Sequence, residues 1–431
     1  MTSTRSQRFG WYMADWANSA FVTTVVTVFL GPYLTTVAEN SANGNGQIDV
    51  FGIGIHPGSL FAYAVSVSVL LQVFILPYIG TKTDRTSNKR MILLATSLVG
   101  SLATIAMFTI NADSGNYLLG AALFIVANIA FGANVVVVNA FLPMLSTPEH
   151  RDALSSRGWA FGYLGGGLLL FIQLMWFQQI EDSGGSVSAV VRGILASAGI
   201  WWLLFSLIPW FTLPKSLPAL APLQTSPLKQ FVTTLRDMKA YPMTLLFFVA
   251  YLLYNDAVQT VIQMASVYGQ EELKLPLGTL TKAILLVQFV AIGGSLLFGR
   301  LSRWIGTKQA IVVGLIGWAG VLIAAYAVVS TETGFYVLAA VIAIVMGGTQ
   351  ALSRSLFSVM IPKGKEAEYF ALYEISDKGT SWLGPLVFGL ALNLTASYRV
   401  AVLSLIVFVI LGLVLLLRVN VRSAMVKTGN V

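Results

Sequence analysis

The chain has 431 residues, of which 56% are hydrophobic and only 10% are charged, so it is excluded from the ordinary soluble proteins, in which about a quarter of residues are charged. The formal net charge of +8 does not indicate nucleic acid as a partner, because the basic residues are spread over short loops and form no cluster. Cysteine is absent, which excludes disulfides, thiolate metal sites and cysteine nucleophiles, and the mean hydropathy of +0.77 predicts an integral membrane protein.

Apolar segments close to the roughly 20 residues that cross a bilayer follow one another along the chain. We therefore predict an all-α membrane protein with twelve transmembrane helices in two bundles of six. The first six spans are expected near Trp11–Val37, Ser59–Ile79, Met91–Ile110, Asn116–Leu142, Trp159–Gln178 and Val191–Leu213. The second six are expected near Tyr241–Val267, Leu280–Phe298, Gln309–Val329, Phe335–Ile361, Glu368–Leu394 and Tyr398–Leu417. Asp15 and Asn18 interrupt the first apolar stretch, so we expect an uncleaved span and not a signal peptide.

The longest predicted cytoplasmic connection divides the chain into an N-terminal bundle (1–213), a linker (214–240) and a C-terminal bundle (241–431). Within the linker, Ser226-Pro227 is a helix-start signal. Four apolar side chains then fall on one helical face: Leu228, Phe231, Leu235 and Met238. We expect a short amphipathic helix on the inner membrane surface, with a plain polar linker as the alternative.

The loop charges predict the orientation of the spans. If both termini are cytoplasmic, twenty lysine and arginine residues lie on that side of the membrane and four lie opposite, in agreement with the positive-inside rule. The four are Arg192, Lys274, Lys282 and Arg399. We expect a multi-pass protein of the plasma membrane (the inner membrane in a bacterium) with both termini in the cytoplasm.

Six ionisable residues lie inside the predicted spans, where a charge costs about 2.5–3.5 kcal/mol on insertion scales. They are Asp15, Asp256, Arg354, Glu374, Asp377 and Lys378, on spans one, seven, ten and eleven. Spans three, six, nine and twelve have no ionisable residue in their interiors, so we expect them to face lipid. Because buried charges usually face a protein interior or a water-filled path, this pattern predicts an ion or substrate route.

Two of these groups are predicted to lie at a similar depth. Arg354 and Glu374 are each about seven residues from the cytoplasmic ends of spans ten and eleven, or roughly 10 Å deep at the helical rise. Asp377 and Lys378 follow Glu374 at i+3 and i+4, on the same helical face. These residues either line a substrate path or form a buried ion-pair network that fixes helix packing.

The two intramembrane aspartates have several possible roles. Asp15 is expected in the cytoplasmic third of the membrane and Asp256 nearer the middle, with no basic residue within a helical turn of Asp256. A carboxylate there can bind a substrate ammonium, carry a coupling proton or pair with a distant base. The sequence leaves these three roles open.

Amide side chains accompany the charges, and the first and seventh spans resemble each other in this respect. Asn18 follows Asp15, as Asn255 and Gln259 flank Asp256, which indicates a weak internal repeat of the two halves. Five amides are candidates for lining a polar cavity: Asn18, Asn139, Asn255, Gln259 and Gln350. Hydrogen bonds between helices are the alternative for such residues.

The loop after the second span concentrates charge at the membrane boundary. Its candidate gating residues are Gly80, Asp84, Arg85, Lys89 and Arg90. Membrane orientation explains the bases, whereas Asp84 could pair with a neighbouring helix and act as a latch. No phosphate-binding loop of the form G-x-x-x-x-G-K-[ST] occurs, so ATP is not expected as the energy source within this chain.

Several motifs together resemble one transporter family. The residues Gly80, Asp84, Arg85, Lys89 and Arg90 are similar to the signature loop of the major facilitator superfamily. More particular stretches resemble the vacuole effluxer-like branch, whose fungal members export amino acids from the vacuole: Trp11–Phe21, Tyr254–Asp256, Gly347–Ser355 and Leu372–Glu374, the last followed by Lys378 and by Ser381–Pro385.

The resemblance implies twelve helices, alternating access, and a cavity lined by spans one, four, seven and ten. The second signature loop departs from the pattern, because it keeps Gly299, Arg300 and Arg303 but lacks the acidic residue.

We expect a secondary transporter for a small polar or zwitterionic solute, with amino-acid efflux and proton coupling as finer expectations. In this hypothesis Arg354 binds a carboxylate, and Asp256 or Asp15 binds an ammonium group or a proton. The alternatives are a proton-coupled exporter of amphipathic compounds and a non-transporting membrane scaffold or receptor. We expect no enzymatic activity, cofactor, metal or nucleic-acid partner, and a monomer in the lipid bilayer.

Overall fold

The computed structural model describes residues 3–85, 88–111, 115–215, 227–379, 383–395 and 397–430. Within these ranges, eleven helices are long and apolar enough to cross a membrane, and they correspond to the first ten expected spans and the last. The remaining span, expected over Glu368–Leu394, is covered by α14 (Glu366–Gly379) and the apolar α15 (Leu383–Thr395), which lie on either side of residues 380–382. The chain is therefore an all-α membrane protein with the expected twelve spans.

The helices group into two compact units, and each is described by itself. The N-unit contains Thr4–Asn139 and Leu164–Ala221, and the C-unit contains Met1–Ser3, Ala140–Tyr163 and Pro222–Val431. The sequence suggested a division at the linker 214–240, whereas packing places Ala140–Tyr163, from the first half of the chain, in the C-unit. This grouping brings part of the fifth span into contact with the residues of the tenth.

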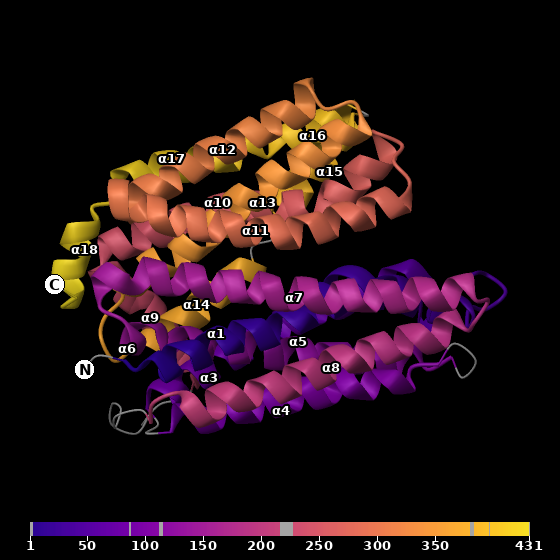
Figure 1. The fold of residues 1–431 in the computed structure, drawn as a ribbon, viewed down its shortest axis with the longest axis horizontal. Coiled ribbons are helices and arrows are strands. Elements are labelled where there is room, and N and C mark those ends of the chain that lie inside the picture. The colour runs from indigo at the N-terminus through magenta and orange to yellow at the C-terminus, as the bar shows by residue number, and fades with distance from the viewer. Residues whose placement is uncertain are drawn as a thin grey trace. The chain divides into compact units, whose positions relative to one another are not determined.

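The N-unit is built from long helices that run alongside one another (Figure 1). Its elements are α1 (Arg5–Ala20), a π-helix (Phe21–Phe29), α2 (Leu30–Glu39), α3 (Leu60–Asp84), α4 (Lys89–Ala106), α5 (Tyr117–Ala140), the second part of α7 (Arg151–Asp182) and α8 (Val187–Thr212). Short 3-10 turns at Pro57–Ser59 and Met107–Thr109 complete it. Helix α8 packs along both α1 and α4, which places the first span inside the unit.

The first span contains a nine-residue π-helix that the sequence pattern did not predict. Its residues include a run of valine and threonine, whose branched side chains are stiff and fit an α-helix less well. The Thr27 hydroxyl donates to the carbonyl of Val22, five residues earlier, at 2.9 Å. Thr24 Oγ1 donates to Gln173 Oε1 of α7 at 2.6 Å, so the wider turn is held from outside the helix. Such π segments occur often at functional sites.

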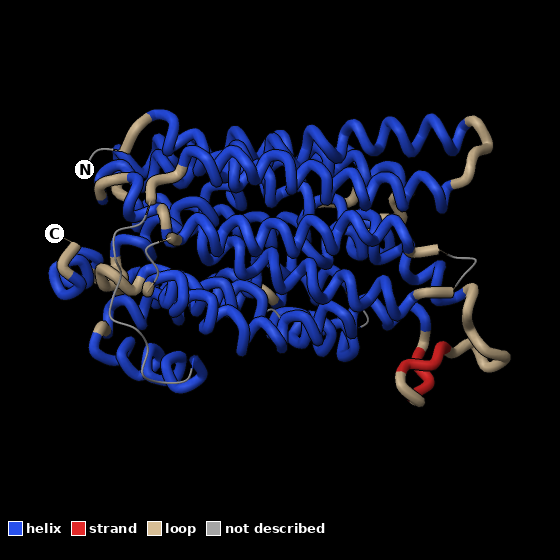
Figure 2. Tube along the Cα trace, turned by 90° about the horizontal axis from the view of Figure 1, so that it is seen from below, coloured by secondary structure: helices blue, strands red, loops and turns tan. Residues whose placement is uncertain are grey.

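A small hairpin connects α2 to α3, which the predicted spans also did not include. Strands β1 (Ile48–Val50) and β2 (Ile53–Ile55) pair antiparallel and project beyond the helices that they connect (Figure 2). The Tyr117 hydroxyl of α5 donates to the carbonyl of Asp49 at 2.8 Å. The loop between the first two spans is therefore ordered and attached to the fourth.

The C-unit begins with α6 (Leu142–Leu145), a 3-10 turn (Pro148–His150) and the first part of α7. Its other elements are α9 (Pro227–Asp237), a 3-10 turn (Met238–Ala240), α10 (Pro242–Glu271), α11 (Leu277–Ile305), α12 (Thr307–Ala327), α13 (Glu332–Val359), α14, α15, α16 (Tyr398–Ser404), α17 (Ile406–Arg418) and α18 (Val421–Thr428). Helix α13 packs along α11 and α12, and α10 packs along α17. Most of α13 is buried, so its polar residues lie in the interior of the unit.

The linker contains the expected helix, α9, and it is attached to the start of α14. Thr234 Oγ1 donates to the buried carboxylate of Glu368 at 3.1 Å, and Lys365 pairs with Asp237 at 2.8 Å. Leu235 is 40% exposed, whereas Met238 lies in the following turn and is fully buried, so these two do not share one lipid-facing surface. The side chains of Leu228 and Phe231, expected on the same face, lie outside the described residues.

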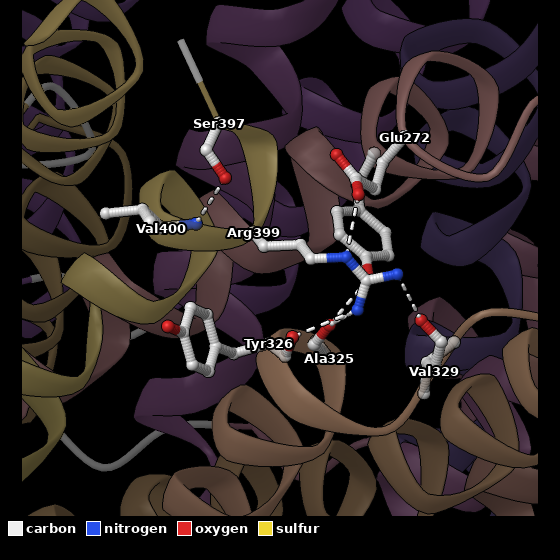
Figure 3. A network of polar contacts seen from close by, with 8 residues as sticks. Glu272, Ala325, Tyr326, Val329, Ser397, Arg399 and Val400 are labelled. Carbon is white, nitrogen blue, oxygen red and sulfur yellow. Dashed lines mark hydrogen bonds and ion pairs between the residues drawn. The ribbon is translucent and has the colours of Figure 1, made fainter. Parts of the chain in front are cut away.

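An arginine joins three helices at one end of the C-unit (Figure 3). Arg399 of α16 pairs through Nε with Glu272, directly after α10, at 2.7 Å. Its Nη1 donates to the carbonyl of Tyr326 at 2.9 Å, and its Nη2 donates to that of Val329 at 2.8 Å. These carbonyls lie at and just beyond the C-terminus of α12, where a cation is favoured by the helix dipole. The sequence had assigned Arg399 only to membrane orientation.

Candidate functional site

Helices α10 and α13 place two of the intramembrane charges at the same level of the C-unit. The Tyr254 hydroxyl of α10 and the Ser353 hydroxyl of α13 are hydrogen-bonded at 2.6 Å. Asp256 is two residues after Tyr254, and Arg354 directly follows Ser353. Because this bond fixes the register of the two helices, the acid and the base lie within about one helical turn of the same height.

Asp256 is a buried carboxylate with no ion-pair partner in the described part of the chain. Its side chain belongs to a residue that is 2% exposed, and neither carboxylate oxygen has a hydrogen-bond partner there. Gly384 of α15 packs against this turn of α10: a Cβ atom on Gly384 would lie 3.1 Å from the backbone oxygen of Asp256 and would collide with the Thr260 hydroxyl. A buried, unpaired carboxylate is costly, which makes Asp256 a candidate for binding a cation or a proton.

Arg354 is also buried, with 4% exposure, and it points toward the start of α7. Its Nε donates to Ser155 Oγ and its Nη2 donates to the Ser155 carbonyl, both at 2.9 Å. The guanidinium carbon lies 5.4 Å from the centre of the Trp159 ring, a cation–π distance. One turn further along α7, the Tyr163 hydroxyl donates to Gln350 Oε1 at 3.2 Å. Residues 155, 159 and 163 thus follow one face of α7 along α13.

Sequence reasoning missed the α7 side of this cluster. Arg151 is one of the twenty bases that the sequence assigned only to the cytoplasmic side. It is 5% exposed and donates through Nη1 to the carbonyl of Ser358 at 2.6 Å. Ser155 Oγ donates to the carbonyl of Ala351 at 2.7 Å. The spacing of Arg151, Ser155 and Trp159 at intervals of four was a detectable signal, because it places polar and aromatic groups on one face at the start of a membrane helix.

The acidic helix α14 contributes Glu374 to the candidate residues whose side chains are described. Glu374 is 5% exposed, and the preceding Tyr373 stacks on Tyr251 of α10 with ring centres 4.2 Å apart. This contact places Glu374 next to α10 in the interior of the C-unit. The side chains of Asp377 and Lys378 lie outside the described residues. The expected approach of Glu374 to Arg354 stays a prediction, as does the shared face with Asp377 and Lys378.

The remaining C-unit amides lie on the same two helices. Asn255 is buried at 2% exposure, and Gln259 and Gln350 are half-buried. Gln350 is held by Tyr163, and Gln259 lies one turn after Asn255. These amides lie within a few residues of Asp256 and Arg354 along α10 and α13, and their role in a polar lining stays a prediction.

In the N-unit, Asn18 belongs to a hydrogen-bonded core. Asn18 Nδ2 donates to Asn134 Oδ1 at 2.9 Å, and Asn134 Nδ2 donates to the hydroxyls of Thr96 and Ser97 at 3.0 and 2.8 Å. These bonds join the first, third and fourth spans, which supports the packing alternative for Asn18. Asn18 Oδ1 is buried without a partner among the described residues.

Two further N-unit candidates complete the set. Asp15 is half-buried on α1, one turn before Asn18, and its backbone carbonyl accepts from the Ser19 hydroxyl at 2.9 Å. Asn139, near the end of α5, is 2% exposed. The N-unit thus contributes one intramembrane acid and buried amides.

The signature loop forms contacts within the N-unit. Asp84, 2% exposed at the end of α3, pairs with Lys89 at the start of α4 at 3.3 Å. Arg90 donates to the carbonyls of Trp210 and Leu213 at the end of α8, at 3.3 and 3.1 Å. Gly80 is buried and Arg85 half-buried. Asp84 is therefore paired with a lysine of its own loop, at the start of the next helix, and its role as a latch stays a prediction.

No group of three or more histidine, cysteine, aspartate or glutamate residues suited to a metal ion occurs in the described ranges. The arrangement combines a buried acid, a buried base and amides on helices that cross the membrane. It is suited to binding a small charged or zwitterionic molecule, and it shows no arrangement for covalent catalysis in these ranges.

Comparisons with known proteins agree with this description. The sequence model of the family described as "Vacuole effluxer Atg22 like" matches residues 3–429. An uncharacterised MFS-type transporter of Bacillus subtilis, YxiO, is 29% identical, over 95% of this chain and 94% of the relative. Autophagy-related protein 22 of Yarrowia lipolytica is 28% identical, over 87% of this chain and 78% of the relative.

Solved structures show the same fold at low sequence identity. The Escherichia coli fucose:proton symporter FucP superposes with a TM-score of 0.70 at 14% identity, over 96% of this chain and 97% of that structure. A bacterial homologue of the iron transporter ferroportin, in an outward-facing state, gives 0.66 at 14% identity, over 96% and 98%. These similarities concern the fold alone.

Proposed function

The chain belongs to the vacuole effluxer Atg22-like family and is a transporter of the major facilitator type, and we propose that its solute is small and zwitterionic, an amino acid in particular. The proposal adds that transport is outward, proceeds by alternating access and is coupled to protons. It also places a monomer in the plasma membrane with both termini in the cytoplasm. A non-transporting scaffold or receptor, the other class considered, does not agree with the family.

The observation that carries the proposal is the presence of a buried acid and a buried base at a similar height of the C-unit. The Tyr254–Ser353 bond fixes Asp256 and Arg354 at a similar height, and both are buried. A zwitterion presents a carboxylate for an arginine and an ammonium for an aspartate, so its two charges match the two groups. Asp15 on α1 is the second candidate for the ammonium or the proton.

An exporter of amphipathic compounds is the other candidate function, and aromatic side chains favour it. The Trp159 ring faces Arg354, and Tyr373 lies between Tyr251 and Phe357 at ring-centre distances of 4.2 and 5.1 Å. Such rings would contact the apolar part of an amphipathic cation or anion. Transport of apolar amines or acids in preference to amino acids would support this candidate.

The test is flux in liposomes that contain the purified protein, with radiolabelled amino acids offered one at a time. For the amino acid that is transported, Arg354→Ala should lower flux at least about 30-fold, because an ion pair with the substrate carboxylate is lost. Arg422→Ala removes an exposed arginine of the same unit, in α18, and serves as the matched control. Unchanged flux in Arg354→Ala, with the protein folded, would remove Arg354 from the site.

A further inference from the structure

One edge of the Arg354 guanidinium is occupied by two oxygens of a single residue. Nε donates to Ser155 Oγ and Nη2 donates to the Ser155 carbonyl, both at 2.9 Å. Nε and Nη2 lie on the same edge of the planar group, and arginine uses such an edge to bind both oxygens of a carboxylate. Ser155 therefore occupies the two positions that a bound carboxylate would take.

The Ser155 hydroxyl is oriented for this role by α13 itself. Its single proton is donated to the carbonyl of Ala351 at 2.7 Å, so the oxygen's lone pairs remain for Arg354. Ser155 is fully buried. The contact is thus a defined pair of acceptors within the C-unit.

A second donor lies next to the guanidinium. Trp159 follows Ser155 by one helical turn, its ring faces Arg354, and its buried indole N–H has no hydrogen-bond acceptor among the described residues. An unsatisfied buried donor costs about 1–3 kcal/mol. An anionic ligand at Arg354 would supply an acceptor close to this indole as well.

We propose that Ser155 is an internal stand-in for the solute carboxylate, which displaces it from the Nε–Nη2 edge of Arg354 and gains the Trp159 indole as a further donor. This inference rests on the proposed function, since it assumes that Arg354 binds the solute. The exchange favours the solute because a carboxylate forms bonds to arginine that are roughly twice as strong as those of neutral oxygens. Ser155 returns to Arg354 when the solute leaves, so Arg354 keeps its partners in the empty site.

Competition between Ser155 and the solute for Arg354 predicts that removing the serine hydroxyl will tighten solute binding. When a ligand must displace an internal group, its apparent Kd equals its intrinsic Kd divided by the fraction of molecules in which the site is open. Ser155→Ala removes the hydroxyl acceptor and keeps the carbonyl, so the apparent Kd for the solute should fall about three- to tenfold, the value of one hydrogen bond. A serine that only supported the packing of α7 would, when replaced, weaken binding or leave it unchanged.

The experiment measures thermal stabilisation of the purified full chain by leucine, glutamate, lysine and alanine, and by 3-methylbutylamine, which lacks the leucine carboxylate. Ser155→Thr retains the hydroxyl and should restore the original Kd. Ser156→Ala removes the neighbouring buried hydroxyl and is the matched control. Trp159→Phe keeps the ring but not the N–H, and it should raise the Kd. The same variants are assayed for flux, where Ser155→Ala should lower KM without raising kcat.

The outcomes separate the two proposals. Tighter binding in Ser155→Ala, reversed in Ser155→Thr and absent for 3-methylbutylamine, supports the stand-in. Unchanged or weaker binding in Ser155→Ala, while Arg354→Ala abolishes binding, overturns the stand-in and leaves the proposed function intact. Binding that survives Arg354→Ala, or the failure of every amino acid in the panel to bind, overturns the role of Arg354 and with it both proposals.

Discussion

Two carboxylates of the α10 region, Glu272 and Asp256, differ in whether they have a partner. Glu272, at the end of the helix, meets Arg399 at 2.7 Å, and Arg399 also donates to the carbonyls that end α12 (Figure 3). Asp256, in the middle of the helix, has no hydrogen-bond partner among the described residues. The first carboxylate is committed to the fold, whereas the second is the one that the proposed function assigns to a ligand or a proton.

The two arginines differ in the same way. Arg399 has a carboxylate and helix-terminal carbonyls as partners, so any exchange would break an ion pair. The Nε–Nη2 edge of Arg354 is held by the neutral oxygens of Ser155, which a carboxylate can replace. The comparison teaches that burial alone does not identify a functional arginine, and that the acceptors on each edge of its guanidinium have to be considered separately.

The largest expected effect comes from removing the structural arginine. Arg399→Ala should lower the free energy of unfolding by about 2–3 kcal/mol, or about 30- to 150-fold in the folding equilibrium, because Glu272 loses its partner and the end of α12 loses its donors. Unfolding in detergent by a thermal or denaturant scan measures this change. Flux per folded molecule should stay within twofold of the original.

Lys282→Ala, an exposed cation of the same unit, is the control for Arg399→Ala and should change stability by less than about 0.5 kcal/mol. If Arg399→Ala left the fold stable but shifted the solute Kd tenfold, the division between a structural and a functional arginine would be wrong.

The sequence predicted the spans well because bilayer thickness fixes their length and apolar content. The ninth span, expected at Gln309–Val329, is observed at Thr307–Ala327. The π register of Phe21–Phe29 was not predicted, since it depends on contacts such as Thr24 with Gln173 from a distant helix. The composition of the segment itself does not predict a contact with a residue about 150 positions away.

The candidate site residues were identified from the sequence only in part, because contacts between distant helices cannot be derived from local composition. Asp256 and Arg354 were identified because charge inside an apolar span is conspicuous. Ser155 and Trp159 were not, because their spacing of four residues after Arg151 indicates a shared helical face but not which helix that face meets. Arg399 was identified as a charged residue but was assigned the wrong role. The sequence counted it as a loop charge, whereas in the fold it joins helices through partners that are distant in the sequence.

The next effect concerns the unpaired carboxylate. Asp256→Asn should lower solute accumulation driven by an imposed proton gradient at least about tenfold, because an amide cannot take up and release the coupling proton. Stability should change by less than about 1 kcal/mol, since the amide is isosteric and no ion pair is lost. Liposome uptake after a pH jump measures the first quantity and thermal unfolding the second.

Glu272→Gln is the matched control for Asp256→Asn, because it changes the other carboxylate in the same way. It should retain gradient-driven uptake and lose stability. Uptake by Asp256→Asn that still follows the proton gradient would remove Asp256 as the proton carrier and leave the ammonium role to be tested by amine competition.

The smallest effect measures the Glu272–Arg399 pair itself. Side-chain exposures of 24% and 26% place the pair between a surface and a buried ion pair. A double-mutant cycle with Glu272→Gln and Arg399→Ala should therefore give a coupling energy of about 0.5–1 kcal/mol, smaller than the loss from Arg399→Ala alone, because the carbonyls that end α12 account for the rest. The coupling should fall in high salt, since a partly exposed pair is screened. A coupling equal to the whole Arg399→Ala effect would show that the ion pair, and not the capping of α12, holds these helices together.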